Sequence, residues 1–246
     1  RKQPYPVFGG DKVFYSNNNY HNHYAYCNEC GGEPTQNSEG YYEISNAQEL
    51  YWFAEHVNGG NTTANAILTA DIVLYKNLLD ADGNPSGNAT NNWIPIGKDD
   101  KNGYKGIFDG QGHTVSGMYF VNNEKEMHIG LLGTLGDEKN QSDATIKNAG
   151  VVDSYFAGKF YIGGICGNVK QGTISNCYNA GTVMSNVASG GVCGSLYKGI
   201  VENCYNTGRI HGNYYTGGVC GAYSDGMLNN CYNTGTISGA LYVGGI

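Results

Sequence analysis

Four side chains that can ligate a metal stand close together near the start of the sequence. His21 and His23 precede Cys27 and Cys30, which form a Cys-x-x-Cys pair. Zinc prefers tetrahedral ligation by thiolate and imidazole groups, and this spacing is common in one half of such a site. A second Cys-x-x-Cys pair is missing from the sequence. Three interpretations therefore stay open: a zinc site, a local Cys27–Cys30 disulfide, or free thiols.

Six further cysteines occur in the second half of the chain as three pairs. The pairs are Cys166 with Cys177, Cys193 with Cys204, and Cys220 with Cys231. A less regular copy of the same segment has Leu132 and Ala149 at the two positions, and this joint loss favours a disulfide within each pair. The alternatives are buried free thiols that behave as small apolar residues, and stacked pairing or metal binding between successive copies.

One loop has the alternating oxygen side chains of a calcium site. Asp80, Asp82 and Asn84 supply them, but Pro85 and Asn91 occupy the positions where a calcium loop needs glycine and glutamate. The sequence therefore predicts a polar hairpin loop here, and calcium binding is not expected.

Motifs for catalysis are absent from the sequence. It contains no His-Glu-x-x-His, no Gly-x-Ser-x-Gly and no phosphate-binding glycine loop. Carboxylates such as Asp109, Asp153, Glu202 and Asp225 do not recur in register, so they define no pair suited to glycoside hydrolysis. His113 lies in an expected strand and fits a structural role. We expect a chain that is not an enzyme and requires no cofactor.

A repeat of 27 residues must position these side chains. Gly-Gly-Ile-Cys-Gly at residues 163–167 returns as Gly-Gly-Val-Cys-Gly at 190–194 and 217–221, and Asn-Cys-Tyr-Asn returns in step at 176–179, 203–206 and 230–233. The unit is too short for a propeller blade and shows no helical period. It fits one coil of a β-solenoid, which buries its apolar face only by stacking on its neighbours.

An asparagine bend is expected in each coil. Ile174 and Cys177 are three residues apart, so strict alternation would place them on opposite faces, and a left-handed bend at Asn176 returns both to the interior. Stacking of coils then predicts an amide ladder and an outward file of tyrosines. The ladder would contain Asn148, Asn176, Asn203 and Asn230, and the file Tyr178, Tyr205 and Tyr232.

These units resemble the GLUG repeat of bacterial surface proteins. Upstream segments at 47–54, 68–72, 93–97 and 106–115 resemble the start of the right-handed β-helix in the same proteins. The resemblance covers residues 41–246 and implies an all-β, right-handed parallel β-helix. It implies less about function, because such modules occur in adhesins and also ahead of the catalytic domain of metallopeptidases similar to immunoglobulin A proteases.

Three regions follow from these patterns. Residues 1–40 form an N-terminal arm or small Cys/His appendage, residues 41–128 a capping helix with the first irregular coils, and residues 129–246 the regular coils, which continue beyond this sequence. An amphipathic α-helix over residues 46–57 should cover the open end of the first coil. Short strands are expected near 66–74, 93–97, 105–109 and 113–121.

Composition excludes two classes of partner. The net charge is −7 with no basic patch, which argues against nucleic acid, and no apolar run is long enough to span a membrane. Eight cysteines in a chain with 39 glycines and 21 tyrosines suggest an extracellular setting.

We therefore expect a non-catalytic adhesive or scaffold module on the bacterial cell surface. Two roles stay open for its tyrosine file. The tyrosines could bind a host or dietary glycan or glycoprotein, because tyrosine offers a large contact area and a polar hydroxyl, or their stacking could only stabilise the outer sheet. The alternative is an accessory region of a secreted metallopeptidase or carbohydrate-active enzyme whose catalytic domain lies outside this chain.

Overall fold

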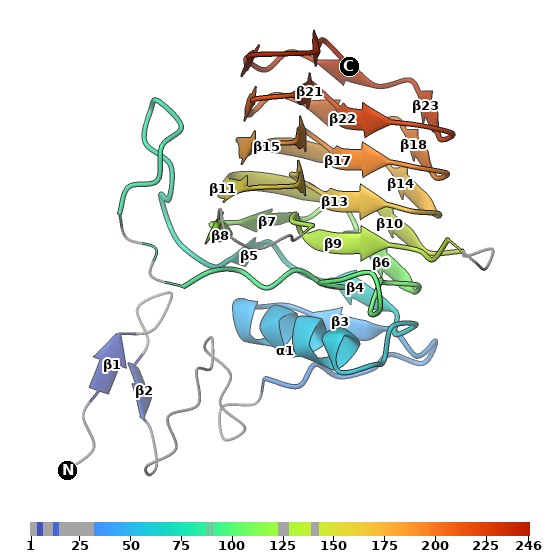
Figure 1. Cartoon of the computed structure of the whole chain (residues 1–246). Coiled ribbons are helices and arrows are strands. Elements are labelled where there is room, and N and C mark those ends of the chain that lie inside the picture. Colours follow the sequence, from blue (N-terminus) through green and yellow to red (C-terminus); the bar gives the residue numbers. More distant parts are fainter. Residues whose placement is uncertain are drawn as a thin grey trace.

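Seven turns of the chain each contribute one strand to a parallel sheet, so the molecule is a β-solenoid (Figure 1). Stacking satisfies the backbone groups that a single coil would leave unpaired at both edges. This computed structural model describes residues 4–6, 12–14, 32–87, 89, 91–122, 128–138 and 143–246. The predicted parallel solenoid with a short N-terminal helix is confirmed.

Two large sheets form the long sides of the solenoid. The seven-stranded sheet contains β3 (Tyr42–Ile44), β4 (Ala66–Leu68), β6 (Ile107–Asp109), β10 (Thr145–Lys147), β14 (Thr173–Ser175), β18 (Ile200–Glu202) and β23 (Met227–Asn229). The nine-stranded sheet contains β5 (Ile72–Val73), β7 (Thr114–Ser116), β8 (Tyr119–Asn122), β11 (Gly150–Gly158), β15 (Tyr178–Ser185), β19 (Tyr205–Asn206), β20 (Arg209–Gly212), β24 (Tyr232–Asn233) and β25 (Ile237–Gly239).

Two four-stranded sheets complete the coils. The cysteine sheet contains β9 (Leu132–Leu135), β13 (Cys166–Val169), β17 (Cys193–Leu196) and β22 (Cys220–Tyr223). The other contains β12 (Tyr161–Gly163), β16 (Ala188–Gly190), β21 (Tyr215–Gly217) and β26 (Val243–Gly244). A separate antiparallel pair joins β1 (Pro4–Pro6) to β2 (Lys12–Phe14).

The predicted asparagine bends are present and turn the apolar residues inward. Asn148, Asn176, Asn203 and Asn230 all have a positive φ, between 49° and 54°. Ile174 and Cys177 are both fully buried as a result. The amide of Asn176 donates to Asn148 Oδ1 at 3.1 Å, and that of Asn230 donates to Asn203 Oδ1 at 3.3 Å, so part of the ladder forms.

A second asparagine ladder lies inside the solenoid and was not predicted. Asn179 Nδ2 donates to Asn206 Oδ1 at 2.8 Å, and Asn206 Nδ2 donates to Asn233 Oδ1 at 2.7 Å. Asn179 and Asn206 have no solvent exposure. Each also bonds the backbone two residues further on, so the amides are satisfied in the apolar interior and tie three coils together.

The helix α1 (Ala47–Asn58) lies across the N-terminal end of the stacked coils, as predicted (Figure 1). Asn46 caps it by accepting from the backbone N–H of Glu49, and the Glu49 carboxylate accepts in return from Ser45 N. Its apolar face packs on aromatic residues of the first coils, with the Tyr51 ring 5.4 Å from that of Trp93. The buried positions are Ala47, Leu50, Tyr51, Phe53, Ala54 and Val57.

The predicted strand at residues 93–97 is wrong. Only Ile96 makes a bridge there, to Leu132, and no strand forms. Pro95 has no N–H to donate, which breaks the ladder at its centre. The segment still contributes to the core, because Trp93 is buried and its indole N–H donates to Gly130 O at 3.0 Å.

The loop that resembled a calcium site is a polar hairpin, as predicted. Leu79 and Pro85 form an antiparallel bridge, and we call the segment between them the hairpin. Asp80 Oδ1 accepts from the backbone N–H groups of Asp82 and Asn84, each at 2.9 Å. The hydrogen bond from Asn84 is the main reason why the pKa of Asp80 is lowered. The carboxylate therefore shapes the turn.

The hairpin lies against the outward side of the nine-stranded sheet. The carboxylate of Asp153 accepts from the backbone N–H of Leu79 at 2.8 Å and from that of the residue before it at 2.9 Å. Thr182 Oγ1 donates to Gly83 O at 2.8 Å. Arg209 donates to the carbonyl oxygen of Ala81 at 3.3 Å. These contacts attach the hairpin to three successive coils, through β11, β15 and β20.

Candidate functional site

The six repeat cysteines are free, so the predicted disulfides within each coil do not form. They line the interior in two files, each with one cysteine per coil. Cys166, Cys193 and Cys220 pair in register, and Cys177 N donates to Cys204 Sγ in the second file. In each predicted pair, the first cysteine lies on a strand of the cysteine sheet and the second lies at the asparagine bend, so the two belong to different files. Sequence spacing did not reveal that separation.

Burial makes these thiols unreactive. Desolvation raises the pKa of Cys166 to about 12, because the charged thiolate would lose its hydration. The pKa of Cys204 is raised to about 12, mainly by its hydrogen bond with the thiol of Cys177. Since the thiolate is the reactive form, both side chains are inert at neutral pH and behave as small apolar core residues.

We expect iodoacetamide to leave the five buried repeat cysteines of the native chain unmodified. The half-exposed Cys231 should react slowly, because its hydrogen bond with the Cys204 thiol raises its pKa. After unfolding in guanidinium without reductant, all six should be alkylated. Peptide mapping by mass spectrometry separates them from Cys27 and Cys30. Any disulfide-linked peptide from the repeat cysteines would contradict the free-thiol interpretation.

The N-terminal cluster of His21, His23, Cys27 and Cys30 lies outside the described residues. Among the residues that the structure does describe, no group of three or more His, Cys, Asp or Glu side chains is placed to hold a metal. Within that same part of the chain, no helix has the length and apolar content needed to cross a membrane.

Two carboxylates noted in the sequence stabilise the fold. Asp153 holds the hairpin. Asp109 accepts from Asn148 Nδ2 and Gln111 N, each at 2.9 Å, and lies 3.2 Å from Lys147 Nζ. Partial burial alone would raise the pKa of Asp109, but these hydrogen bonds and the lysine charge outweigh it and lower the pKa. Both carboxylates therefore accept hydrogen bonds from neighbouring residues of the fold.

The predicted tyrosine file forms on the outward side of the nine-stranded sheet. The rings of Tyr178 and Tyr205 are 5.0 Å apart and 2° from parallel, and those of Tyr205 and Tyr232 are 5.0 Å apart at 4°. Each ring covers a face of the next, so those faces cannot stack on a sugar ring. The file therefore presents hydroxyl groups and ring edges, and its stacking stabilises the sheet.

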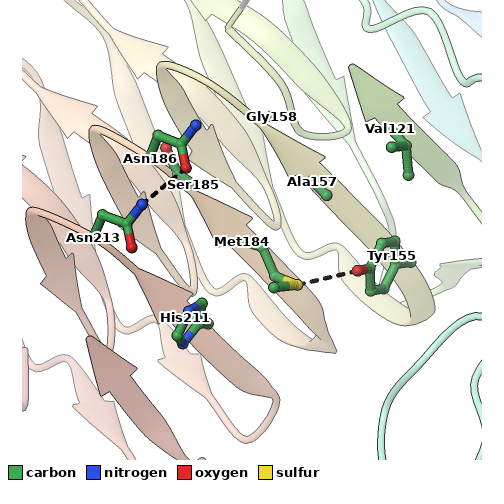
Figure 2. A pocket seen from close by; sticks show the side chains of 9 residues that line it. All are labelled: Val121, Tyr155, Ala157, Gly158, Met184, Ser185, Asn186, His211 and Asn213. Carbon is green, nitrogen blue, oxygen red and sulfur yellow. Dashed lines mark hydrogen bonds between the residues drawn. The ribbon is translucent and has the colours of Figure 1, made fainter. Parts of the chain in front are cut away.

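Further along the same sheet, a shallow groove of about 280 Å³ opens on the surface (Figure 2). It exists because Ala157 of β11 has only a small side chain, whereas Val121, Tyr155 and Met184 project around it. These residues come from three successive coils, β8, β11 and β15. Gly158 contributes backbone to the lining, since a methyl group there would point toward Ile162 in the core. Sequence reasoning missed the groove, because its walls meet only through the strand register.

Polar atoms line the far side of the groove and are ready to bond a ligand. Asn213 Nδ2 donates to Asn186 Oδ1 at 3.0 Å, which leaves the Asn186 amide N–H groups and Asn213 Oδ1 without partners among the described residues. His211 Nδ1 lies 2.9 Å from Ser238 Oγ, and its Nε2 has no partner in the same part of the chain. None of the residues that line the groove is Asp, Glu, Lys or Arg. The groove therefore suits a polar, uncharged ligand.

The hydroxyl of Tyr155 completes the groove. It donates to the thioether of Met184 at 3.1 Å, a weak acceptor that a better one can replace (Figure 2). Burial and the neighbouring ring of Tyr119 raise its pKa, so the group stays protonated and able to donate at neutral pH. Donors, acceptors and apolar surface thus meet in one shallow site, as they do in many ligand sites.

Comparison with known proteins supports the assignment of the repeats. The family model of the GLUG motif matches residues 158–184, 185–210 and 212–238. The crystal structure of a candidate immunoglobulin A1 protease from Bacteroides ovatus superposes with a TM-score of 0.57 at 17% identity, covering 85% of this chain and 80% of that chain. At this identity the similarity shows the fold alone. No curated protein matches the sequence. The chain is therefore a β-solenoid region that carries three GLUG motifs.

Proposed function

We propose that this chain is a non-catalytic extracellular module of a bacterial surface protein, and that it binds glycans or glycoproteins. The observation that carries the proposal is the uncharged groove over Ala157 and Gly158. A solenoid supports such a role because its stacked coils form a rigid, extended scaffold. The GLUG motifs are consistent with a repeat module of this kind.

The chemistry of the groove favours a sugar over a purely apolar partner. A sugar ring presents hydroxyl groups at its edge and C–H groups on its faces. The amides of Asn186 and Asn213 match the hydroxyl groups, whereas Val121 and Met184 match the C–H faces. On the same sheet, the tyrosine file adds further hydroxyl groups for a longer glycan or for a glycoprotein.

Filling the groove should abolish binding. Ala157 is a half-buried outward residue, so Ala157→Trp places a large ring in the groove and leaves the core unchanged. We expect the amount of protein retained on a mucin and glycan array to fall by about tenfold or more. A ligand that can no longer enter the groove loses about 1.4 kcal/mol or more of binding free energy. The melting temperature should change by no more than about 2 °C, as for other surface substitutions.

Thr173→Trp is the matched control, because Thr173 is also a half-buried outward strand residue but lies on the seven-stranded sheet. Its retention should equal that of the unchanged chain. Equal retention by all three proteins would contradict binding at the groove.

A second function is favoured by the structural similarity to a candidate immunoglobulin A1 protease. In this alternative the chain is an accessory region of a secreted enzyme, a metallopeptidase or a carbohydrate-active enzyme, with its catalytic domain elsewhere. The encoding gene distinguishes the two functions. Further repeats with a cell-wall anchor after Ile246 support the adhesive module, whereas a zinc-peptidase motif supports the accessory region.

A further inference from the structure

A second pocket, on a different side of the solenoid, has features of a ligand site. It lies outside the cysteine sheet, where Asn168 of β13 and Ser195 of β17 are neighbours in register. Its volume is about 230 Å³, smaller than the roughly 300–1,000 Å³ of sites for drug-sized ligands. We call it the Asn168 pocket. Tyr161, Tyr197 and Lys170 form its walls together with Asp100, His128 and Glu138.

An unpartnered amide at the floor points to a ligand. Asn168 is only 7% exposed, yet its side-chain amide has no hydrogen-bond partner among the described residues. Among the described residues, the one fully buried side-chain N or O atom without a partner is Thr216 Oγ1, so the amide atoms of Asn168 reach the open pocket. Two donors and one acceptor of Asn168 are therefore available to a molecule in the pocket. The Ser195 hydroxyl beside it also has no partner within the described part of the chain.

The charges in the pocket restrict what can enter. Lys170 Nζ lies 3.1 Å from Asp100 Oδ2 and 3.3 Å from Glu138 Oε1, so two carboxylates surround one ammonium group. Burial alone would lower the pKa of Lys170, but the two carboxylates outweigh it and raise the pKa. The cluster has a net charge of about −1 when His128 is neutral, which repels anions. Both carboxylates are half-exposed and can accept further hydrogen bonds.

The aromatic wall adds apolar surface. The ring of His128 lies 5.3 Å from that of Tyr161, and its Nδ1 lies 3.0 Å from Thr134 Oγ1. Burial lowers the pKa of His128 more than Asp100 raises it, so the ring is neutral at neutral pH. Lys198 Nζ stands 5.0 Å from the ring centre of Tyr197, which occupies one face of that ring.

We propose that the Asn168 pocket binds one uncharged sugar residue. The hydroxyl groups of a pyranose can donate to the carboxylates of Asp100 and Glu138 and bond both ends of the Asn168 amide. Its C–H face can rest on Tyr161. An anionic sugar is disfavoured by the carboxylates. The site is separate from the groove on the nine-stranded sheet, so either can exist without the other.

Isothermal titration of the whole chain tests this proposal. The probes are galactose, glucose, mannose and N-acetylglucosamine, with galacturonate as the anionic comparison. We expect saturable binding of at least one neutral sugar, and at least about tenfold weaker binding by Asn168→Ala, which loses two or more hydrogen bonds. Galacturonate should bind about tenfold more weakly than galactose.

Two further variants test whether the sugar binds at the Asn168 pocket. Asp100→Asn alters a half-exposed loop residue and should weaken binding about fivefold, even if Asn168→Ala does not fold. Ala157→Trp fills the other groove and should leave sugar binding to the Asn168 pocket unchanged. Lack of saturation by all four neutral sugars, tighter binding of galacturonate, or equal affinity in the folded pocket variants would each overturn the proposal.

Discussion

Gly190→Ala should lower the free energy of unfolding by about 3 kcal/mol or more, at the upper end for an overpacked core. A methyl group at Gly190 would collide with the carbonyl oxygen of Cys193 and would lie 2.7 Å from the backbone nitrogen of Gly221. Both are backbone atoms within the stacked coils, so they cannot rotate away as a side chain could. Guanidinium unfolding followed by circular dichroism measures the change.

Gly59→Ala is the control for this substitution. Gly59 follows α1 with a φ of −77°, which any residue can adopt, and a methyl group there would lie 3.2 Å from Glu55 O, its nearest neighbour, farther away than at Gly190. We expect a change in the free energy of unfolding of about 1 kcal/mol or less. If the two alanine variants were equally destabilised, close coil packing would not explain the glycine of the repeat.

Asn206→Ala should lower the free energy of unfolding by about 4 kcal/mol, because it removes four hydrogen bonds of the inner ladder. It removes the acceptor of Asn179 Nδ2 and the donor to Asn233 Oδ1, and it frees Gly208 N and Gly208 O. Each buried group left without a partner costs about 1–3 kcal/mol. Thermal and guanidinium unfolding report the loss.

Asn213→Ala is the matched control for the buried ladder. Asn213 also bonds an asparagine 27 residues away, but this bond to Asn186 is exposed to water. Water can replace it, so we expect a change within about 0.5 kcal/mol. Similar losses in the two variants would mean that burial of the inner ladder adds nothing to stability.

The architecture could be predicted because each coil repeats the same local sequence pattern. The 27-residue period predicts stacking, and Asn176 predicts the bend that turns Ile174 and Cys177 inward. The inner ladder was also present in the sequence, since Asn179 follows outward Tyr178 and therefore points inward. It was missed because a buried asparagine is unusual unless its partners are known, and these partners come from adjacent coils.

The groove and the cysteine arrangement depend on distances between residues of different strands and coils, which the sequence of one repeat does not determine. Val121 and Ala157 are neighbours through the pairing of β8 with β11, where the coils do not yet follow the regular period. Cys166 and Cys177 recur together, but recurrence does not tell how far apart two files lie across the interior. Both features are properties of the stacked coils.

The hairpin changes how this solenoid is expected to assemble. In a simple repeat array each coil contacts only its neighbours, so folding can start anywhere and spread along the stack. The bonds from Thr182 to Gly83 and from Arg209 to Ala81 instead span 99 and 128 residues. Such contacts require closure of a long loop and form late, after the coils that they join. The hairpin thus couples β11, β15 and β20 into one cooperative unit.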